Sequence, residues 1–224
     1  MRSAVLVGAA GVGALAFARK TLRNLGATCA ERRATLPGDE LVPGAKSRST
    51  MAITIDAPPS AVWPWLVQMG CDRAGFYSWD RLDNGGRPSA TEIHPEWQTL
   101  EIGDRMLCTP NGRYWFQVEQ LESERVLVLR SSIDVRTHRP FDPAGPRPRF
   151  FVDGVWAFVL EQLPEGKTRL VVRSFGAVQP RLLLGAVNVV FVDPAHFVMQ
   201  RRQLRNLKRR AEGVRPEPEL AAVA

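Results

Sequence analysis

The alternation of hydrophobic and polar positions predicts that the chain opens with a strand and a short helix. Residues 50–56 alternate and place Ile53 and Ile55 on one face, which is typical of a half-buried strand. Residues 61–69 then carry apolar side chains at helical spacing and end at Gly70, a residue that commonly terminates helices. We therefore expect a strand followed directly by a helix.

The middle of the chain predicts an antiparallel meander. Four stretches alternate as strands do, and turn residues separate them. Short helices are expected around residues 79–82 and 95–100, whereas residues 136–149 hold four prolines and should form a loop. The expected strands are residues 114–120, 126–131, 151–161 and 168–178, with a hairpin turn at 164–167.

A long helix is expected at the end of the domain. Asp193 suits a helix cap and Pro194 suits the first turn, so the helix should run from there to about residue 212. One side carries apolar residues and the other an arginine run. The preceding apolar stretch, residues 182–192, is too short to span a membrane and should pack on the sheet. The expected apolar side consists of Phe197, Val198, Leu204, Leu207 and Ala211.

These elements predict an α+β protein with one main domain, because strands and helices are segregated along the chain. A length of 224 residues suits one domain with extensions. Glycine and proline turns make residues 26–48 look like a linker. We expect an apolar segment at 1–25, the folded domain at 49–213 and a disordered tail at 214–224.

The amino-terminal segment has three interpretations. Residues 3–18 are uncharged, and Arg19 and Lys20 follow them. As a helix this stretch spans about 24 Å, against a hydrocarbon core of about 30 Å. It could anchor the domain to the cytoplasmic face of a membrane, as its flanking basic residues favour. It could also be a cleaved signal or a tail of a cytoplasmic protein; export is the less favoured outcome.

The net charge of +7 disfavours nucleic acid as a partner once its distribution is considered. The basic excess lies in residues 1–48 and 193–215, and the central body is close to neutral. A basic run at 201–210 lacks the interleaved aromatic residues that stack on bases. Those arginines could instead approach an anionic membrane surface.

The sequence predicts no metal site and no cofactor. The three cysteines form no C-x-x-C pair, and the three histidines are far apart, whereas tetrahedral zinc sites show close ligand pairs. The glycines at 8–13 follow no predicted strand, so they do not form a dinucleotide fingerprint.

Several segments resemble those of a known family in their order along the chain and in their amino-acid sequence. They are residues 53–70 (ITIDAPPSAVWPWLVQMG), 75–84 (GFYSWDRLDN), 100–105 (LEIGDR), 156–161 (WAFVLE), 168–173 (TRLVVR) and 196–204 (HFVMQRRQL). Over residues 36–212 the chain resembles the START-like (SRPBCC) superfamily, which includes polyketide cyclase/dehydrase-like proteins, and specifically an uncharacterised bacterial branch of it. The resemblance implies a helix-grip fold, in which a curved antiparallel sheet wraps around a long carboxyl-terminal helix and leaves an internal cavity.

The resemblance leaves three functions open. The first is binding of a small hydrophobic ligand, such as a lipid or polyketide-like molecule, by a carrier or sensor. The second is a cyclase or dehydratase acting on a polyketide-like substrate, and the third is interaction with a membrane surface. Because members of one fold differ in function, the resemblance does not decide whether the protein is an enzyme.

Aromatic side chains are the main candidates for a binding site, since pockets for small ligands are mostly apolar. The competing interpretation of each is core packing. Arg173 would bind an anionic ligand group if it points inward, and would otherwise be a surface residue. The candidate ligand-binding residues are Trp65, Met69, Phe76, Tyr77, Trp79, Trp115, Trp156, Phe158 and Arg173.

Acid–base candidates are few. Tyr77, Asp80 and Asn84 are spaced to share one face of a short helix, and they either line a cavity mouth or form a cap-and-turn network. His94 lies in a polar loop. The weak catalytic candidates are Tyr77, Asp80 and His94.

Overall fold

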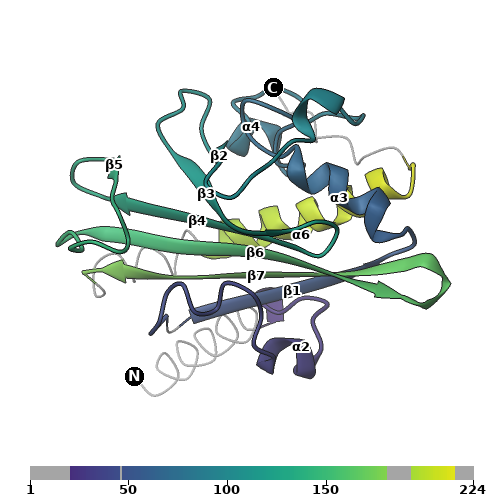
Figure 1. Cartoon of the computed structure of the whole chain (residues 1–224), viewed down its shortest axis with the longest axis horizontal. Helices are drawn as coiled ribbons and strands as arrows, with labels where there is room; N and C mark the ends of the chain where they lie inside the picture. Colours follow the sequence, from purple (N-terminus) through teal and green to yellow (C-terminus); the bar gives the residue numbers. More distant parts are fainter. Residues whose placement is uncertain (1–20, 46, 181–192, 215–224) are drawn as a thin grey trace, which may run out of the picture.

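The protein is an α+β structure built on one antiparallel sheet (Figure 1). A computed structural model describes residues 21–45, 47–180 and 193–214. Within these ranges seven strands form a curved open sheet in the order β1-β7-β6-β4-β3-β2, with β5 paired to β4. Every strand pair in it is antiparallel, and the last helix, α6, runs along one face.

The observed elements follow the expected order. The helices are α2 (Cys29–Arg33), α3 (Pro59–Val67), α4 (Asp80–Asp83) and α6 (Asp193–Ala211), with short 3₁₀ turns η1 (Pro95–Trp97) and η2 (Pro164–Gly166). The strands are β1 (Ser47–Ile55), β2 (Arg105–Leu107), β3 (Trp115–Glu122), β4 (Val126–Asp134), β5 (Arg139–Pro140), β6 (Phe151–Leu163) and β7 (Lys167–Gln179).

Local signals placed most of these elements correctly. The β6–β7 hairpin turns at η2, where Glu165 and Gly166 both adopt positive φ. Helix α3 begins at Pro59, and no side-chain hydrogen bond caps it. The proline-rich loop contains the two-residue β5, which pairs with the end of β4.

Alternation along the strands gives the sheet two buried faces. The face toward α6 and α3, called here the helix face, holds the larger apolar cluster, which includes Leu129, Phe158 and Leu170. The opposite, outer face holds a smaller cluster that includes Val128 and Phe175. Both faces of the sheet are therefore covered, which explains why β4 and β6 carry apolar side chains on both sides.

The expected linker at residues 26–48 is instead part of the folded domain. The backbone N–H groups of Thr50 and Ala52 in β1 donate to the carbonyl oxygens of Arg23 and Leu25, both at 3.0 Å. Val42 is fully buried against the outer-face cluster. We call residues 21–45 the amino-terminal strap; the linker prediction was wrong because contacts distant in sequence hold the strap down.

Arg173 in β7 holds the strap through a buried clamp. Only 1% of the residue is exposed. Its guanidinium donates to Asp39 Oδ2 at 2.6 Å, to the carbonyl oxygen of Ala34 at 2.8 Å and to that of Glu31 at 2.7 Å. Arg173 is thus neither a surface residue nor a residue of the helix face.

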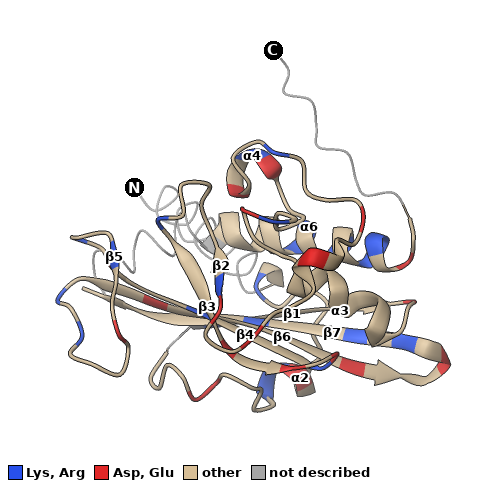
Figure 2. Ribbon diagram, turned by 45° about the horizontal axis from the view of Figure 1, so that its top comes forward, with Lys and Arg blue, Asp and Glu red and all other residues tan. Residues whose placement is uncertain are grey.

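Helix α6 is less simply amphipathic than expected. Val198, predicted on the apolar side, is 50% exposed, whereas Arg202 and Arg210 are buried. The arginine run is therefore divided between buried and solvent-facing positions. Outside α6, basic and acidic residues are scattered over several strands and loops (Figure 2).

Among the described residues, no helix is long and apolar enough to cross a bilayer. The apolar residues 3–18, the stretch 182–192 and most of the tail at 214–224 lie outside the described residues.

Replacing Arg173 should destabilise the fold strongly. In Arg173→Met the carboxylate of Asp39 stays buried without its main partner, and breaking such a pair costs about 3–5 kcal/mol. We expect the free energy of unfolding in urea to fall by about 3 kcal/mol, because Arg48 Nη1 lies 3.4 Å from Asp39 Oδ2 and compensates in part. The exposed Arg33→Met is the matched control and should change stability by less than about 0.5 kcal/mol. Equal stability of the two variants would contradict the clamp.

The strap should loosen in acid through Glu31. Hydrogen bonds from Arg169 lower the pKa of Glu31 from 4.5 to about 2. A depressed carboxyl pKa adds stability above pH 4.5, and this stability is lost as the pH falls from 4.5 to 2. The side chain is partly solvent-exposed, so we expect about 1 kcal/mol. The stability difference between wild type and Glu31→Gln should therefore shrink between pH 6 and pH 3, and a constant difference would count against this role.

Candidate functional site

An aromatic cluster on the helix face centres on Trp156 of β6. Its ring centroid lies 4.8 Å from that of Phe158, 5.4 Å from that of Phe116 in β3, and 6.0 Å from that of Phe76. Phe76 and Phe158 are buried, whereas Trp156 and Phe116 stay partly accessible. The cluster therefore presents aromatic surface that core packing has not closed off.

Helix α6 turns a row of polar side chains toward this cluster. His196, Gln200 and Gln203 are separated by four and three residues, a spacing that places them on one side of a helix. Gln200 and Gln203 are 3% and 2% exposed. We call these three side chains the polar row.

Hydrogen bonds join the polar row to the aromatic cluster. Trp156 Nε1 donates to Gln200 Oε1 at 2.8 Å, and Gln200 Nε2 donates to Gln203 Oε1 at 2.6 Å. Gln203 Nε2 in turn lies 3.6 Å from Met69 Sδ. Buried polar groups keep fixed orientations when they are paired in this way.

His196 and Ser174 complete the polar side of the site. His196 Nε2 lies 3.2 Å from Ser174 Oγ in β7, and the imidazole ring stands edge-on to Trp156 at 6.4 Å between centroids. The named groups come from β3, β6, β7 and α6, which are regular elements, except Met69 and Phe76, which lie between α3 and α4. An aromatic wall with a few oriented polar groups is the usual composition of a small-molecule site.

Tyr77 has a structural role at the other end of α6. Its hydroxyl donates to the carbonyl oxygen of Trp65 at 3.0 Å and accepts from Gln68 Nε2 at 3.1 Å. Burial raises the pKa of Tyr77, so the phenol stays neutral. The guanidinium of Arg210 stacks 4.6 Å above the ring. These contacts satisfy the Tyr77 hydroxyl both as a donor and as an acceptor, and they hold the loop before α4 against α6.

Trp65 and Trp79 pack with buried arginines of α6 and do not join the aromatic cluster. The edge of Trp65 meets Tyr77 at 5.9 Å between centroids. Trp79 lies 4.0 Å beneath the guanidinium of Arg202, whose Nε donates to the carbonyl oxygen of Ser78. A guanidinium buried in such a stack loses contact with water. This desolvation lowers the pKa of Arg210, which stacks on Tyr77.

The remaining acid–base candidates take part in local turns. Helix α4 begins at Asp80, so Tyr77 lies outside it and the expected shared helix face does not form. Asp80 Oδ1 accepts from Ser89 Oγ at 2.5 Å, and Asn84 Nδ2 donates to the carbonyl oxygen of Arg87. His94 stacks on Trp97 at 4.2 Å and lies 3.2 Å from Glu96 Oε1. The cap-and-turn interpretation fits these contacts better than the catalytic one.

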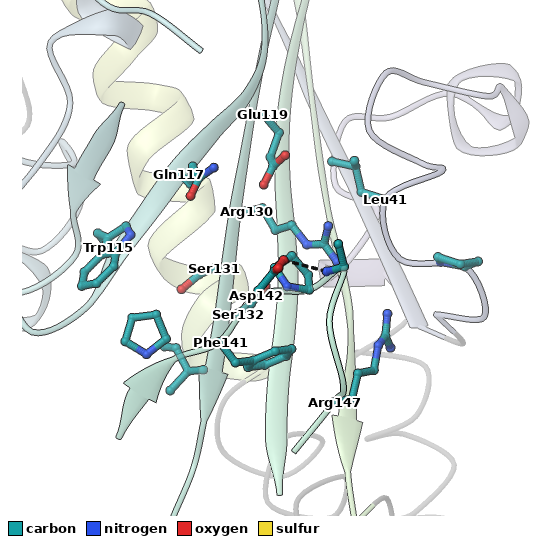
Figure 3. A pocket seen from close by; sticks show the side chains of 15 residues that line it. Leu41, Trp115, Gln117, Glu119, Arg130, Ser131, Ser132, Phe141, Asp142 and Arg147 are labelled. Atoms are coloured by element: carbon teal, nitrogen blue, oxygen red, sulfur yellow. Dashed lines mark hydrogen bonds between the residues drawn. The ribbon is translucent and has the colours of Figure 1, made fainter. Parts of the chain in front are cut away.

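Trp115 lies on the outer face, as Arg173 does. Its ring is covered by the guanidinium of Arg105 at 4.3 Å and lines a cleft on that face (Figure 3). Of the candidate ligand-binding residues, the structure brings together Phe76, Trp156 and Phe158, with Met69 joined through Gln203.

Sequence reasoning missed Gln200, Gln203 and Ser174. A signal for the two glutamines existed, because polar residues at 196, 200 and 203 repeat at helical spacing inside the family-like segment. For Ser174 no such signal existed, since its contact with His196 joins two elements. In the described ranges no group of three or more His, Cys, Asp or Glu side chains is placed to hold a metal ion.

Comparison with known proteins establishes no family. No family model matches the chain, and no curated protein matches it. Among solved structures, a hypothetical protein of Helicobacter pylori is 14% identical with a TM-score of 0.49, covering 78% of this chain and 94% of that one. A protein of Arthrobacter aurescens is 15% identical with a TM-score of 0.43, covering 79% and 91%. DynU16, from the dynemicin biosynthetic locus, is 14% identical with a TM-score of 0.43, covering 77% and 50%.

The Trp156–Gln200 hydrogen bond should contribute measurably to stability. Gln200→Leu leaves the indole N–H and Gln203 Oε1 without their partner, which costs about 1–3 kcal/mol. A double-mutant cycle with Trp156→Phe should show a coupling of about 1 kcal/mol in urea unfolding. Arg201→Leu, at an exposed position of the same helix, should show no coupling with Trp156→Phe. A cycle without coupling for Gln200 would show that the bond is not formed.

Proposed function

We propose that the chain is a helix-grip domain of the START-like type that binds a small, mainly apolar ligand between the sheet and α6. The arrangement of a curved antiparallel sheet along a carboxyl-terminal helix supports this, as do the family-like segments. The observation that carries the proposal is Trp156. It stays partly accessible while aromatic rings surround it and the polar row faces it.

The lining chemistry indicates what the ligand looks like. The partly accessible rings of Phe116 and Trp156, backed by buried Phe158, offer flat apolar surface, which suits an acyl chain or a fused-ring, polyketide-like body. Gln200 and Ser174 offer uncharged polar atoms. We therefore expect the polar end of the ligand to be a neutral hydroxyl or carbonyl group rather than a carboxylate.

Binding is favoured over catalysis by the positions of the acid–base candidates. Tyr77 and Asp80 use their oxygen atoms in fixed structural hydrogen bonds, and His94 stacks in a loop. A general acid or base needs to lie within hydrogen-bond reach of the reacting group. Among the described residues, the ring of Tyr77 meets that of Trp65 and the ring of His94 meets that of Trp97, and neither of these partners belongs to the aromatic cluster. A carrier or sensor is thus the better supported function.

Binding can be tested with tryptophan fluorescence and two probes, 1-dodecanol and 9,10-anthraquinone. We expect at least one of them to change the emission of the full chain saturably. Trp156→Leu should weaken its binding about tenfold or more, equivalent to about 1.4 kcal/mol, because the indole forms the centre of the aromatic wall. Trp97→Leu is the matched control, since this half-buried ring stacks on His94 and not on a ring of the aromatic cluster, and the affinity of this variant should match that of wild type.

The outcome also separates binding from simple core packing. If neither probe binds and Trp156→Leu only lowers the free energy of unfolding, the cluster is ordinary core and the proposal fails. Equal weakening by Trp156→Leu and Trp97→Leu would place the probe elsewhere.

A further inference from the structure

Two of the three cysteines meet where the loop after α3 passes the end of β2. The backbone N–H of Cys71 donates to the carbonyl oxygen of Leu107 at 2.9 Å, and Cys108 is the next residue along the chain. A carbonyl oxygen lies about 2.8 Å from the following α carbon, so the α carbons of Cys71 and Cys108 are within about 7 Å. Disulfides join α carbons about 4.4–6.8 Å apart. The backbone spacing therefore suits a disulfide.

Both cysteine side chains lie on the helix face of the sheet. Cys71 is fully buried in the larger apolar cluster, which also contains Met106 of β2. Cys108 continues the β2–β3 ladder, because its backbone N–H donates to the carbonyl oxygen of Tyr114 at 2.8 Å. Side chains two residues apart in a strand share a face. Cys108 is therefore on the same face as Met106, which is the side where Cys71 is packed.

The turn after α4 packs around the two cysteines and holds them in place. Cys71 Sγ donates to the carbonyl oxygen of Asp83 at 2.8 Å. The next turn of chain lies against the β2–β3 hairpin, since a Cβ atom on Gly85 would come within 2.6 Å of Pro110 Cγ. Helix α4 and β2 accordingly lie beside each other (Figure 1). Both thiols thus belong to one packed junction of three segments.

The thiols differ in access to solvent but share a low acidity. Cys71 is fully buried, whereas Cys108 is partly accessible. Burial raises the pKa of both thiols, that of Cys71 to about 11. The charge of Cys71 is the next largest cause of the raised pKa of Cys108, as expected for neighbouring sulfur atoms. Both groups are therefore protonated at neutral pH, and oxidation proceeds through a small thiolate fraction.

We propose that Cys71 and Cys108 form an intramolecular disulfide when the protein meets a peroxide. The accessible Cys108 reacts first: its thiolate attacks one peroxide oxygen, the O–O bond breaks and hydroxide leaves, which gives a sulfenic acid. The sulfur of Cys71 then attacks the sulfur of Cys108. The S–S bond forms, the S–O bond breaks, and the departing hydroxide takes the Cys71 proton as water. Two thiols are oxidised, and one peroxide is reduced to two waters.

The disulfide connects two segments that supply rings to the aromatic cluster. Phe76 lies in the loop that follows Cys71, and Phe116 of β3 pairs with Met106 in the hairpin that contains Cys108. The bond closes a loop of 38 residues, from 71 to 108, and so restricts the unfolded chain. Oxidation thus ties the Phe76 loop to the β2–β3 hairpin, whether or not a ligand binds between the sheet and α6.

The test uses the full chain with Cys29→Ser, because Cys29 is exposed and would react by itself. The protein is treated with hydrogen peroxide at pH 8.5, quenched with catalase, alkylated with iodoacetamide in denaturant, digested and analysed by mass spectrometry. We expect a loss of two hydrogen atoms, no alkylated cysteine, and a peptide pair joined through Cys71 and Cys108. Dithiothreitol should restore both thiols. The oxidised form should unfold at a urea concentration about 1 M higher than the reduced form.

Serine variants in the same background separate the two steps. Cys71→Ser keeps a hydroxyl group that can donate to the carbonyl oxygen of Asp83, but it removes the second sulfur. We expect the sulfenic acid of Cys108 to accumulate in this variant and to be trapped by dimedone several-fold more than in the parent. Cys108→Ser is the matched variant, in which Cys71 should stay reduced because it is fully buried.

Three results would overturn the proposal. The first is alkylation of both thiols after a treatment that oxidises the exposed Cys29 of wild type. The second is conversion of Cys108 to a sulfinic acid in the parent while Cys71 is still alkylated. The third is a Cys71–Cys108 disulfide that fails to raise the urea midpoint, because the native structure would then not hold the two sulfur atoms in position for bonding.

Discussion

The buried guanidinium of Arg173 is the constraint on which the arrangement of the outer face depends. A charge that is 1% exposed is tolerated only where hydrogen bonds replace water, and here Asp39 and the carbonyl oxygens of the strap supply them. The strap therefore has to lie across β7. Once there, it carries Val42 onto the outer-face cluster and closes a surface that would otherwise expose apolar side chains.

Covering both faces lets one sheet carry two different environments. Because side chains alternate along each strand, Trp156 and Phe158 face α6, whereas Val155 and Ala157 face the strap. The helix face combines aromatic rings with uncharged polar groups, and the outer face combines apolar contacts with buried ion pairs. The same alternation puts Asp153 on the outer face, three residues before Trp156 on the helix face.

Helix α6 is closely packed on one side and meets partly accessible rings on another. Its buried arginines stack on Trp79 and Tyr77 and hold the loops around α4 in place. One side of the helix is therefore closed by satisfied structural contacts. Its polar row instead meets partly accessible rings, which makes this the side where a ligand would gain most from binding.

Sequence by itself determined the elements whose causes are local. Turn residues and alternation defined the β6–β7 hairpin, and cap residues with helical spacing defined α6 to within a residue of its end. Only the tertiary structure decided which face each strand residue joined, so the sequence did not show that Trp115 and Arg173 lie on the outer face. The linker prediction failed for the same reason, since Asp39 lies 134 residues from its partner Arg173. The periodicity of a strand shows that its two faces differ. Contacts between distant segments decide which face packs against the helix.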